Sequence, residues 1–154
     1  MLEVLARHGV KVVVIGGFAA WLHGAPIVTA DLDLVFDREA DNIRRLVDAL
    51  RELNAVYRDP SGRRIEPSAA AFAATTGGGH HLFQTNAGDL DVLRDSSGIG
   101  YGELLPSSIE IEIEGIRARF ASLNSIIDLK TRAGRPKDLA VLPVLRAVLE
   151  DNEE

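Results

Sequence analysis

The chain contains no cysteine among its 154 residues. Disulfide bonds, cysteine-ligated zinc sites and thiol nucleophiles are therefore excluded. The chain also lacks any apolar run close to the roughly 20 residues that a membrane-spanning helix needs. Its first ten residues mix apolar side chains with Glu3, Arg7 and His8, which predicts an amphipathic helix rather than a signal peptide. We therefore expect a soluble, cytoplasmic protein.

An excess of positive charge is also missing. The chain has 17 Lys and Arg residues against 23 Asp and Glu residues, which gives a net charge of −6. Tight, sequence-independent binding to nucleic acid usually requires a basic face, and the overall charge disfavours it here. The cations are nevertheless clustered near the C-terminus, where Lys130, Arg132, Arg135 and Lys137 lie close together in the sequence.

The chain does have the composition of an ordinary globular protein, with 46% hydrophobic and 26% charged residues. Its length suits one domain, so residues 1–154 are predicted to form a single domain. The predicted helices are 2–8, 18–23, 38–53, 67–75, 123–132 and 136–150, and the predicted strands are 10–15, 31–36, 81–85, 89–93, 109–113 and 116–120. This order predicts an α+β fold, with a mixed sheet flanked by helices. We further expect Asp37 to be the N-cap of helix 38–53 and residues 98–102 to form a loop.

The strongest functional signal is a glycine pair followed by two aspartates. Gly16 and Gly17 follow the predicted buried strand 10–15, and a helix is expected to begin directly after them. Glycine lets the backbone approach a ligand closely, and a helix start favours phosphate. Asp31 and Asp33 are two positions apart on the next predicted strand, so both carboxylates point to the same face. Such an oxygen-only pair is suited to a hard cation such as Mg²⁺ or Mn²⁺.

The same segments resemble a known signature. The sequence VIGG at 14–17, followed by TADLDL at 29–34, is similar to the motif of the DNA polymerase β nucleotidyltransferase superfamily. That superfamily takes a third carboxylate from a later strand, and LDVL at 90–93 resembles that strand, with Asp91 as the carboxylate. Asp89 is on the same face and remains the alternative, although it directly follows the predicted turn at Gly88.

A narrower resemblance involves the C-terminal segments. SIIDLK at 125–130 and AGRPKDL at 133–139 look like the closing motif of small bacterial nucleotidyltransferases, including abortive-infection (AbiE-type) toxins and minimal nucleotidyltransferases of toxin–antitoxin pairs. Two positions depart from that pattern. Ile27 stands where many relatives carry an arginine, and Val141-Leu142 stands where they often repeat Asp-Leu.

The resemblance implies a palm-like nucleotidyltransferase fold and a metal-dependent transfer of NMP from an NTP such as ATP to a hydroxyl acceptor. Asp31, Asp33 and Asp91 would be the catalytic and metal-binding residues, with Mg²⁺ or Mn²⁺ as the cofactor. The acceptor would be a protein, an RNA end or a small molecule, and a cognate toxin or antitoxin would be a protein partner. The N–H groups of Gly16 and Gly17 would contact the β- and γ-phosphates. Lys130, Arg135 and Lys137 would neutralise phosphate or a polyanionic acceptor.

Several alternatives remain open from the sequence. The cations near 130–137 are equally typical of an exposed basic stretch ahead of a helix, in which Asp138 caps the helix or pairs with Lys137. His80 and His81 would point to opposite faces of a strand, so at most one of them would contact a substrate. For the whole chain, the alternative to an enzyme is a catalytically silent relative that binds a partner in a toxin–antitoxin pair.

Overall fold

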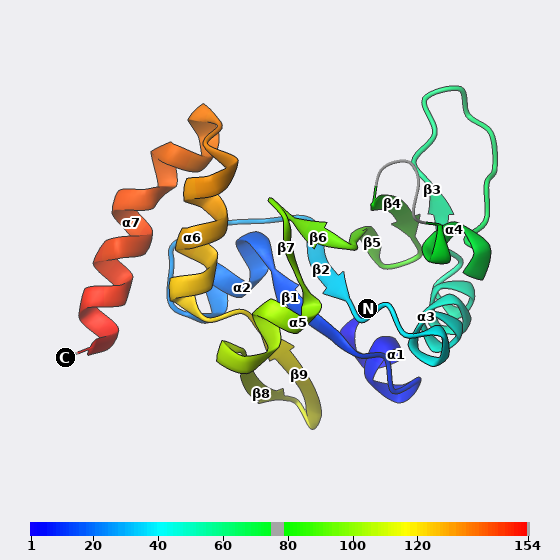
Figure 1. Cartoon of the computed structure of the whole chain (residues 1–154), viewed down its shortest axis with the longest axis horizontal. Helices are drawn as coiled ribbons and strands as arrows, with labels where there is room; N and C mark the ends of the chain where they lie inside the picture. Colours follow the sequence, from blue (N-terminus) through cyan, green and yellow to red (C-terminus); the bar gives the residue numbers. More distant parts are fainter. Residues whose placement is uncertain (75–78, 154) are drawn as a thin grey trace.

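The computed structural model describes residues 1–74 and 79–153. Its centre is a seven-stranded mixed sheet with the order β3-β4-β5-β2-β1-β9-β8 (Figure 1). The pairs β1–β9 and β2–β5 are parallel, and the other neighbours are antiparallel. The strands of this sheet are β1 (Val12–Ile15), β2 (Leu32–Phe36), β3 (Val56–Tyr57), β4 (His80–Thr85), β5 (Gly88–Leu93), β8 (Ile109–Ile113) and β9 (Ile116–Phe120).

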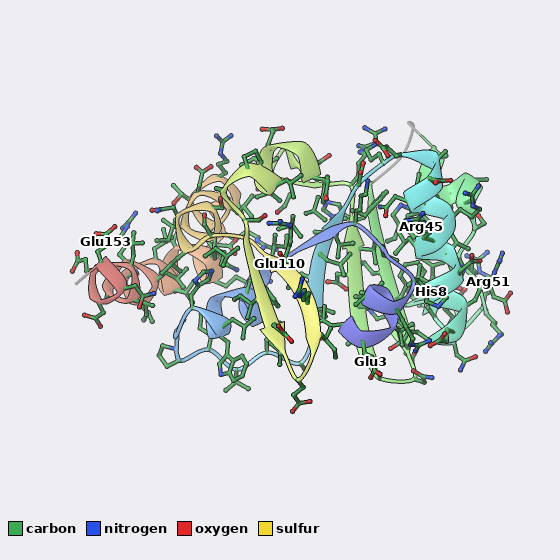
Figure 2. The ribbon with its side chains drawn as sticks, turned by 90° about the horizontal axis from the view of Figure 1, so that it is seen from below. Glu3, His8, Arg45, Arg51, Glu110 and Glu153 are labelled. Carbon is green, nitrogen blue, oxygen red and sulfur yellow. The ribbon has the colours of Figure 1, made fainter. Side chains whose placement is uncertain are left out.

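Helices flank this sheet at both of its ends. In Figure 1, α3 and α4 lie near β3 and β4, whereas α6 and α7 lie at the opposite end of the molecule. Figure 2 shows the same separation from below, with Arg51 on α3 far from Glu153 on α7. The helices are α1 (Leu2–Arg7), α2 (Gly16–Leu22), α3 (Ala40–Glu52), α4 (Ala69–Ala73), α5 (Tyr101–Leu104), the 3-10 helix η1 (Leu105–Ser107), α6 (Leu123–Ala133) and α7 (Pro136–Glu153).

The buried centre of the sheet follows from the hydrophobic pattern of its strands. All four residues of β1 are buried, as expected for a strand that is covered on both faces. Helix α3 contributes Ile43, Leu46, Val47 and Leu50 to the core, and this spacing places them on one face of the helix. Strand β1 and helix α3 were both predicted from these apolar residues. The predicted α+β fold, with a mixed sheet flanked by helices, is confirmed.

Local signals set the ends of the later elements. The β8–β9 hairpin turns at Glu114 and Gly115, which both have positive φ, as a two-residue hairpin turn of this kind requires. The side chain of Ser122 accepts a hydrogen bond from the Ser125 N–H at the start of α6, and Gly134 ends that helix in the left-handed conformation. Pro136 then begins α7.

Two local predictions were wrong. Residues 98–102 do not form a simple loop, because Ile99 and Gly100 form β7 (Ile99–Gly100), which pairs with β6 (Asp95–Ser96), and α5 follows. Burial of Ile99 and Leu104 stabilises this segment. Asp37 is not the N-cap of α3, because Glu39 occupies that position. The side chain of Asn42 donates to the Asp37 carbonyl and so holds the preceding segment in a non-helical conformation.

Helix α4 is shorter than the sequence predicts. The predicted range is 67–75, whereas the helix is Ala69–Ala73. The last predicted residue, Thr75, lies outside the described residues, as do Gly77 and Gly78. Among residues 1–74 and 79–153, none of the helices combines the length and the apolar character that crossing a bilayer requires.

Candidate functional site

The two central carboxylates lie side by side on neighbouring strands. Asp33 of β2 is the register partner of Asp91 on the parallel strand β5, and also of Ile15 at the end of β1. Adjacent strands are about 4.8 Å apart, and because the two residues are in register, their side chains leave the same face of the sheet. Asp31 precedes β2 by one residue and is exposed. The fold therefore brings Asp33 and Asp91 together from positions that are far apart in the sequence.

Gly16 makes room for the Asp33 carboxylate. Its φ is +73°, a conformation that L side chains rarely adopt, and a Cβ at this position would overlap Oδ2 of Asp33. Helix α2 begins at Gly16 itself, two residues earlier than predicted. Gly17 has a different neighbour, because a Cβ there would lie 3.0 Å from the Cβ of Thr29. The glycine pair is thus explained by two close approaches of the segment 29–33.

The electrostatic environment of Asp33 is unfavourable to its charge. Burial raises the pKa of the Asp33 carboxyl to about 7, and hydrogen bonding to Asp91 together with the negative charges of Asp91 and Asp31 contributes to the rise. Lys130 opposes this effect. Such a cluster has more negative charge than its surroundings neutralise, which is the condition under which a bound cation is strongly favoured.

Asp91 has a cation of its own, and that cation is Arg58. Nη2 of Arg58 donates to Oδ1 of Asp91 at 2.7 Å, and Nη1 donates to the Phe83 carbonyl at 2.8 Å. The same Nη1 lies 3.7 Å from Oδ2 of Asp89. Asp89 is the register partner of Gln84 rather than of Asp33. The two aspartates between which the sequence left a choice therefore share one arginine, but only Asp91 is opposite Asp33.

A cavity of about 380 Å³ opens on this face of the sheet. It is lined by all of the predicted site residues except Gly17, together with polar and apolar neighbours that include Ser96, Leu129 and Asp138. The predicted residues in its wall are Gly16, Asp31, Asp33, Asp91, Lys130, Arg135 and Lys137.

The cationic wall of the cavity is organised by a buried aspartate. The Asp138 side chain has no exposed surface, and its Oδ1 accepts from Nζ of Lys130 at 3.2 Å while its Oδ2 accepts from Nε of Arg135 at 2.5 Å. The Asp138 carboxylate also accepts from the Arg135 backbone N–H and so caps α7 in the manner of a capping box. Hydrogen bonds from Arg135 and then Lys130 hold the pKa of Asp138 below its ordinary value.

Of the two roles predicted for Asp138, capping of the helix is confirmed, whereas pairing with Lys137 is wrong. Adjacent residues on a helix do not face each other, whereas residues three apart do, so Asp138 meets Arg135. Lys130 is reached across the contact between α6 and α7. Lys137 remains exposed and lines the cavity.

The two adjacent histidines of β4 separate as the strand period predicts. His81 is buried, with its ring Nδ1 2.8 Å from the Tyr57 hydroxyl and its ring centroid 4.2 Å from that of Phe72. His80 is exposed and lines the carboxylate cavity. Of the two, His80 is therefore the one placed to meet a ligand there.

The donor set fits a hard divalent cation in its chemistry. Carboxylate oxygens are the ligands that Mg²⁺ and Mn²⁺ prefer, and the unfavourable charge on Asp33 would be relieved by such an ion. Within residues 1–74 and 79–153, no three His, Asp or Glu side chains converge closely enough to hold an ion by themselves. The fit thus rests on the Asp33–Asp91 pair, with Asp31 in the wall of the same cavity.

Sequence reasoning missed Arg58. It lies directly after the two-residue strand β3, in a segment that matches no motif, and it is 33 positions from Asp91. Its role depends on the pairing of β3 with β4 and of β4 with β5, which no local pattern encodes. The segment also contains Arg63 and Arg64, so nothing in the sequence singles out Arg58.

Comparison with known proteins identifies the fold. No protein-family model matches the chain, and no curated protein matches it. Several solved structures do resemble it. A crystal structure of ANT(2'')-Ia in complex with adenylyl-2''-tobramycin has a TM-score of 0.60 at 17% identity, with 99% of this chain and 87% of that chain covered.

Two further structures agree with this result. The solution structure of the antibiotic-resistance factor ANT(2'')-Ia has a TM-score of 0.58 at 18% identity and covers 96% of this chain and 80% of that chain. A Thermotoga maritima protein, provisionally assigned as a nucleotidyltransferase, has a TM-score of 0.59 at 16% identity, covering 97% and 88%. The chain therefore has the nucleotidyltransferase fold, and the narrower likeness to AbiE-type toxins stays a prediction.

Proposed function

We propose that this chain is a nucleotidyltransferase that moves an NMP from an NTP to a hydroxyl acceptor with the help of a divalent cation. The observation that carries the proposal is the register pairing of Asp33 with Asp91 in the wall of one cavity. The Gly16 backbone and a group of cations line the same cavity. A nucleotidyltransferase needs carboxylates for metal and positive charge for a triphosphate in one place.

The proposed roles follow from the position of each residue. Asp31, Asp33 and Asp91 would hold Mg²⁺ or Mn²⁺, which when bound neutralises the charge that develops on the phosphoryl oxygens. Asp91 would also favour loss of the proton from the acceptor hydroxyl. That oxygen forms a bond to the α-phosphorus of the NTP, the bond to the bridging oxygen breaks, and pyrophosphate leaves.

The remaining groups would bind the triphosphate. Lys130, Arg135 and Lys137 line the cavity and would neutralise its negative charge through charge-assisted hydrogen bonds. The backbone N–H groups of Gly16 and Gly17 would contact the β- and γ-phosphates. Asp138 would keep Lys130 and Arg135 in place, since both cations donate to its buried carboxylate.

A small molecule or a protein is the favoured acceptor. The net charge of −6 works against a polyanionic acceptor such as an RNA end, because favourable binding of a polyanion needs a basic surface. The similar structure of ANT(2'')-Ia contains an adenylyl group on tobramycin, which supports a small hydroxylated acceptor and ATP as the donor. A cognate toxin or antitoxin remains part of the proposal as a protein partner.

A second candidate function is supported by the ion pair between Arg58 and Asp91. A catalytically silent protein of the same fold, acting as a partner in a toxin–antitoxin pair, would have no need to keep Asp91 free. The 2.7 Å contact is compatible with that reading, and so is Ile27 at the position where many relatives carry arginine.

The test is calorimetry with each NTP in the presence of Mg²⁺ or Mn²⁺. Wild type and the double variant Asp31→Ala/Asp33→Ala are compared, with Asp128→Ala as a control because Asp128 is exposed and pairs with Arg132 on α6. We expect binding that depends on metal, that is lost in the double variant and that is unchanged in the control. Absence of NTP binding to the wild type would contradict the enzyme and favour the silent partner.

A further inference from the structure

The guanidinium of Arg58 occupies the carboxylate that the proposed function needs. Oδ1 of Asp91 accepts from Nη2 of Arg58 at 2.7 Å, a short charge-assisted hydrogen bond. The Asp91 side chain is 20% exposed and that of Arg58 is 29% exposed, so neither charge is fully hydrated. In this state the negative charge of Asp91 is balanced by a cation of the protein itself, the guanidinium of Arg58.

We propose that Arg58 is an exchangeable counter-cation, which competes with a divalent cation for Asp91 and thereby sets the metal affinity of the site. The proposal rests on the proposed function, because it concerns the same carboxylates. Nη2 of Arg58 lies on Oδ1 at hydrogen-bond distance, so a cation that takes this oxygen has to displace the arginine. If the divalent cation binds without displacing the arginine, its charge still repels the Arg58 guanidinium nearby.

The surroundings of Arg58 provide a place for it after displacement. Asp89 lies on the same strand as Asp91, and its Oδ2 is already 3.7 Å from Nη1 of Arg58. The Asp89 side chain is 42% exposed, and it is not part of the cavity wall. A small movement of the guanidinium would exchange the Asp91 contact for the Asp89 contact and keep the hydrogen bond to the Phe83 carbonyl.

The position of Arg58 in the fold allows such a movement. Its backbone is fixed by a hydrogen bond from its N–H to the Leu82 carbonyl, so the shift is confined to the side chain. The residue directly follows β3, which is an edge strand of only two residues. The exchange therefore needs no rearrangement of the sheet.

The test is a titration with Mn²⁺ alone, without nucleotide, measured as free Mn²⁺ by electron paramagnetic resonance. Site-specific binding is defined as the part of the Mn²⁺ binding that is lost in the Asp33→Asn variant. Arg58→Gln removes the charge and retains a donor for Phe83, and we expect it to bind Mn²⁺ at least about tenfold more tightly than the wild type. Arg58→Lys keeps the charge and is expected to stay near the wild type. Arg63→Gln, a matched control in the following loop that pairs with Asp59, should change nothing.

The outcomes distinguish failure of the counter-cation role from failure of the proposed function on which it rests. Mn²⁺ binding to the wild type with equal or weaker binding to Arg58→Gln would overturn the counter-cation role and leave the metal-dependent function standing. Absence of site-specific Mn²⁺ binding in every variant would overturn both. If Arg58→Gln fails to fold, the arginine side-chain NMR signals of the wild type decide the question. Saturating Mg²⁺ is expected to shift the signal of Arg58 and not that of Arg63, and an unmoved Arg58 signal would overturn the proposal.

Discussion

Two aspartate clusters border the same cavity, and their charge balance is opposite. Around Asp138, two cations surround one carboxylate, and its pKa is lowered. Around Asp33, the neighbouring carboxylates of Asp31 and Asp91 outweigh Lys130, and the pKa rises to about 7. The first cluster is satisfied within the protein, whereas the second has an excess of negative charge. We infer from this difference that Asp138 has the structural role of holding Lys130 and Arg135 in place, and that the Asp33 cluster is the part of the site that requires a cation.

The largest expected effect on stability tests how tightly the Asp33 cluster is built. Gly16→Ala is expected to lower the free energy of unfolding by about 3 kcal/mol, because it adds both the penalty of a positive φ and an overlap with the Asp33 carboxylate. Gly62→Ala is the matched control, since Gly62 has a φ of +77° and no atom of residues 1–74 and 79–153 lies within 4 Å of a Cβ placed there. It is expected to lose about 1 kcal/mol. If urea denaturation shows that both variants lose the same free energy of unfolding, the overlap with Asp33 does not destabilise the protein.

The next effect concerns the Asp138 cluster. Asp138→Asn is expected to lower the free energy of unfolding by about 2 kcal/mol, because it removes a buried acceptor from Lys130 and Arg135. The pKa of Asp138 is lowered from 3.8, so its stabilisation is present above that pH and is lost as the pH falls below it. The loss in Asp138→Asn should therefore be constant between pH 5 and 8. Loss of NTP binding without loss of stability would contradict the structural role.

The smallest effect has the opposite sign. Asp33→Asn is expected to raise the free energy of unfolding in EDTA at pH 8 by about 1 kcal/mol, because it removes a charge that burial and two aspartates oppose. Between about pH 4 and pH 7 the folded protein retains a proton that the unfolded chain has released, so wild-type stability falls as the pH rises through this window. The gain should be small at pH 4.5 and complete at pH 8 in urea denaturation. A variant less stable than the wild type at pH 8 would contradict the excess of negative charge around Asp33.

The two clusters also differ in how much of them the sequence predicts. Gly16, Asp31 and Asp33 are separated by short distances along the chain, and strand periodicity is enough to place both aspartates on one face. Asp91 was predicted by resemblance, and its parity on the strand left Asp89 open. The pairing across β2 and β5, which sets Asp91 opposite Asp33, is a long-range contact that no local pattern contains.

The remaining errors have the same physical origin. Asp138 was predicted either to cap the helix or to pair with Lys137. It does cap α7, but helical geometry directs its side chain to Arg135 and packing of α6 on α7 brings Lys130 to it. Arg58 reaches Asp91 only through two consecutive strand pairings. Local spacing thus predicted the carboxylates and the glycines, whereas the partners that set their charge depend on tertiary structure.

The measurement that tests the central claim most directly is a calorimetric titration in the presence of Mn²⁺. The NTP that binds the wild type is titrated into the wild type, Asp91→Asn and Asp89→Asn. The two variants remove the same charge from the same strand, and both aspartates contact Arg58, so they differ in whether the lost carboxylate faces Asp33. We predict that Asp91→Asn weakens metal-dependent NTP binding by at least about 100-fold and that Asp89→Asn weakens it by less than about tenfold. Equal affinities for the two variants, or a larger loss in Asp89→Asn, would contradict a nucleotide site built on the Asp33–Asp91 pair.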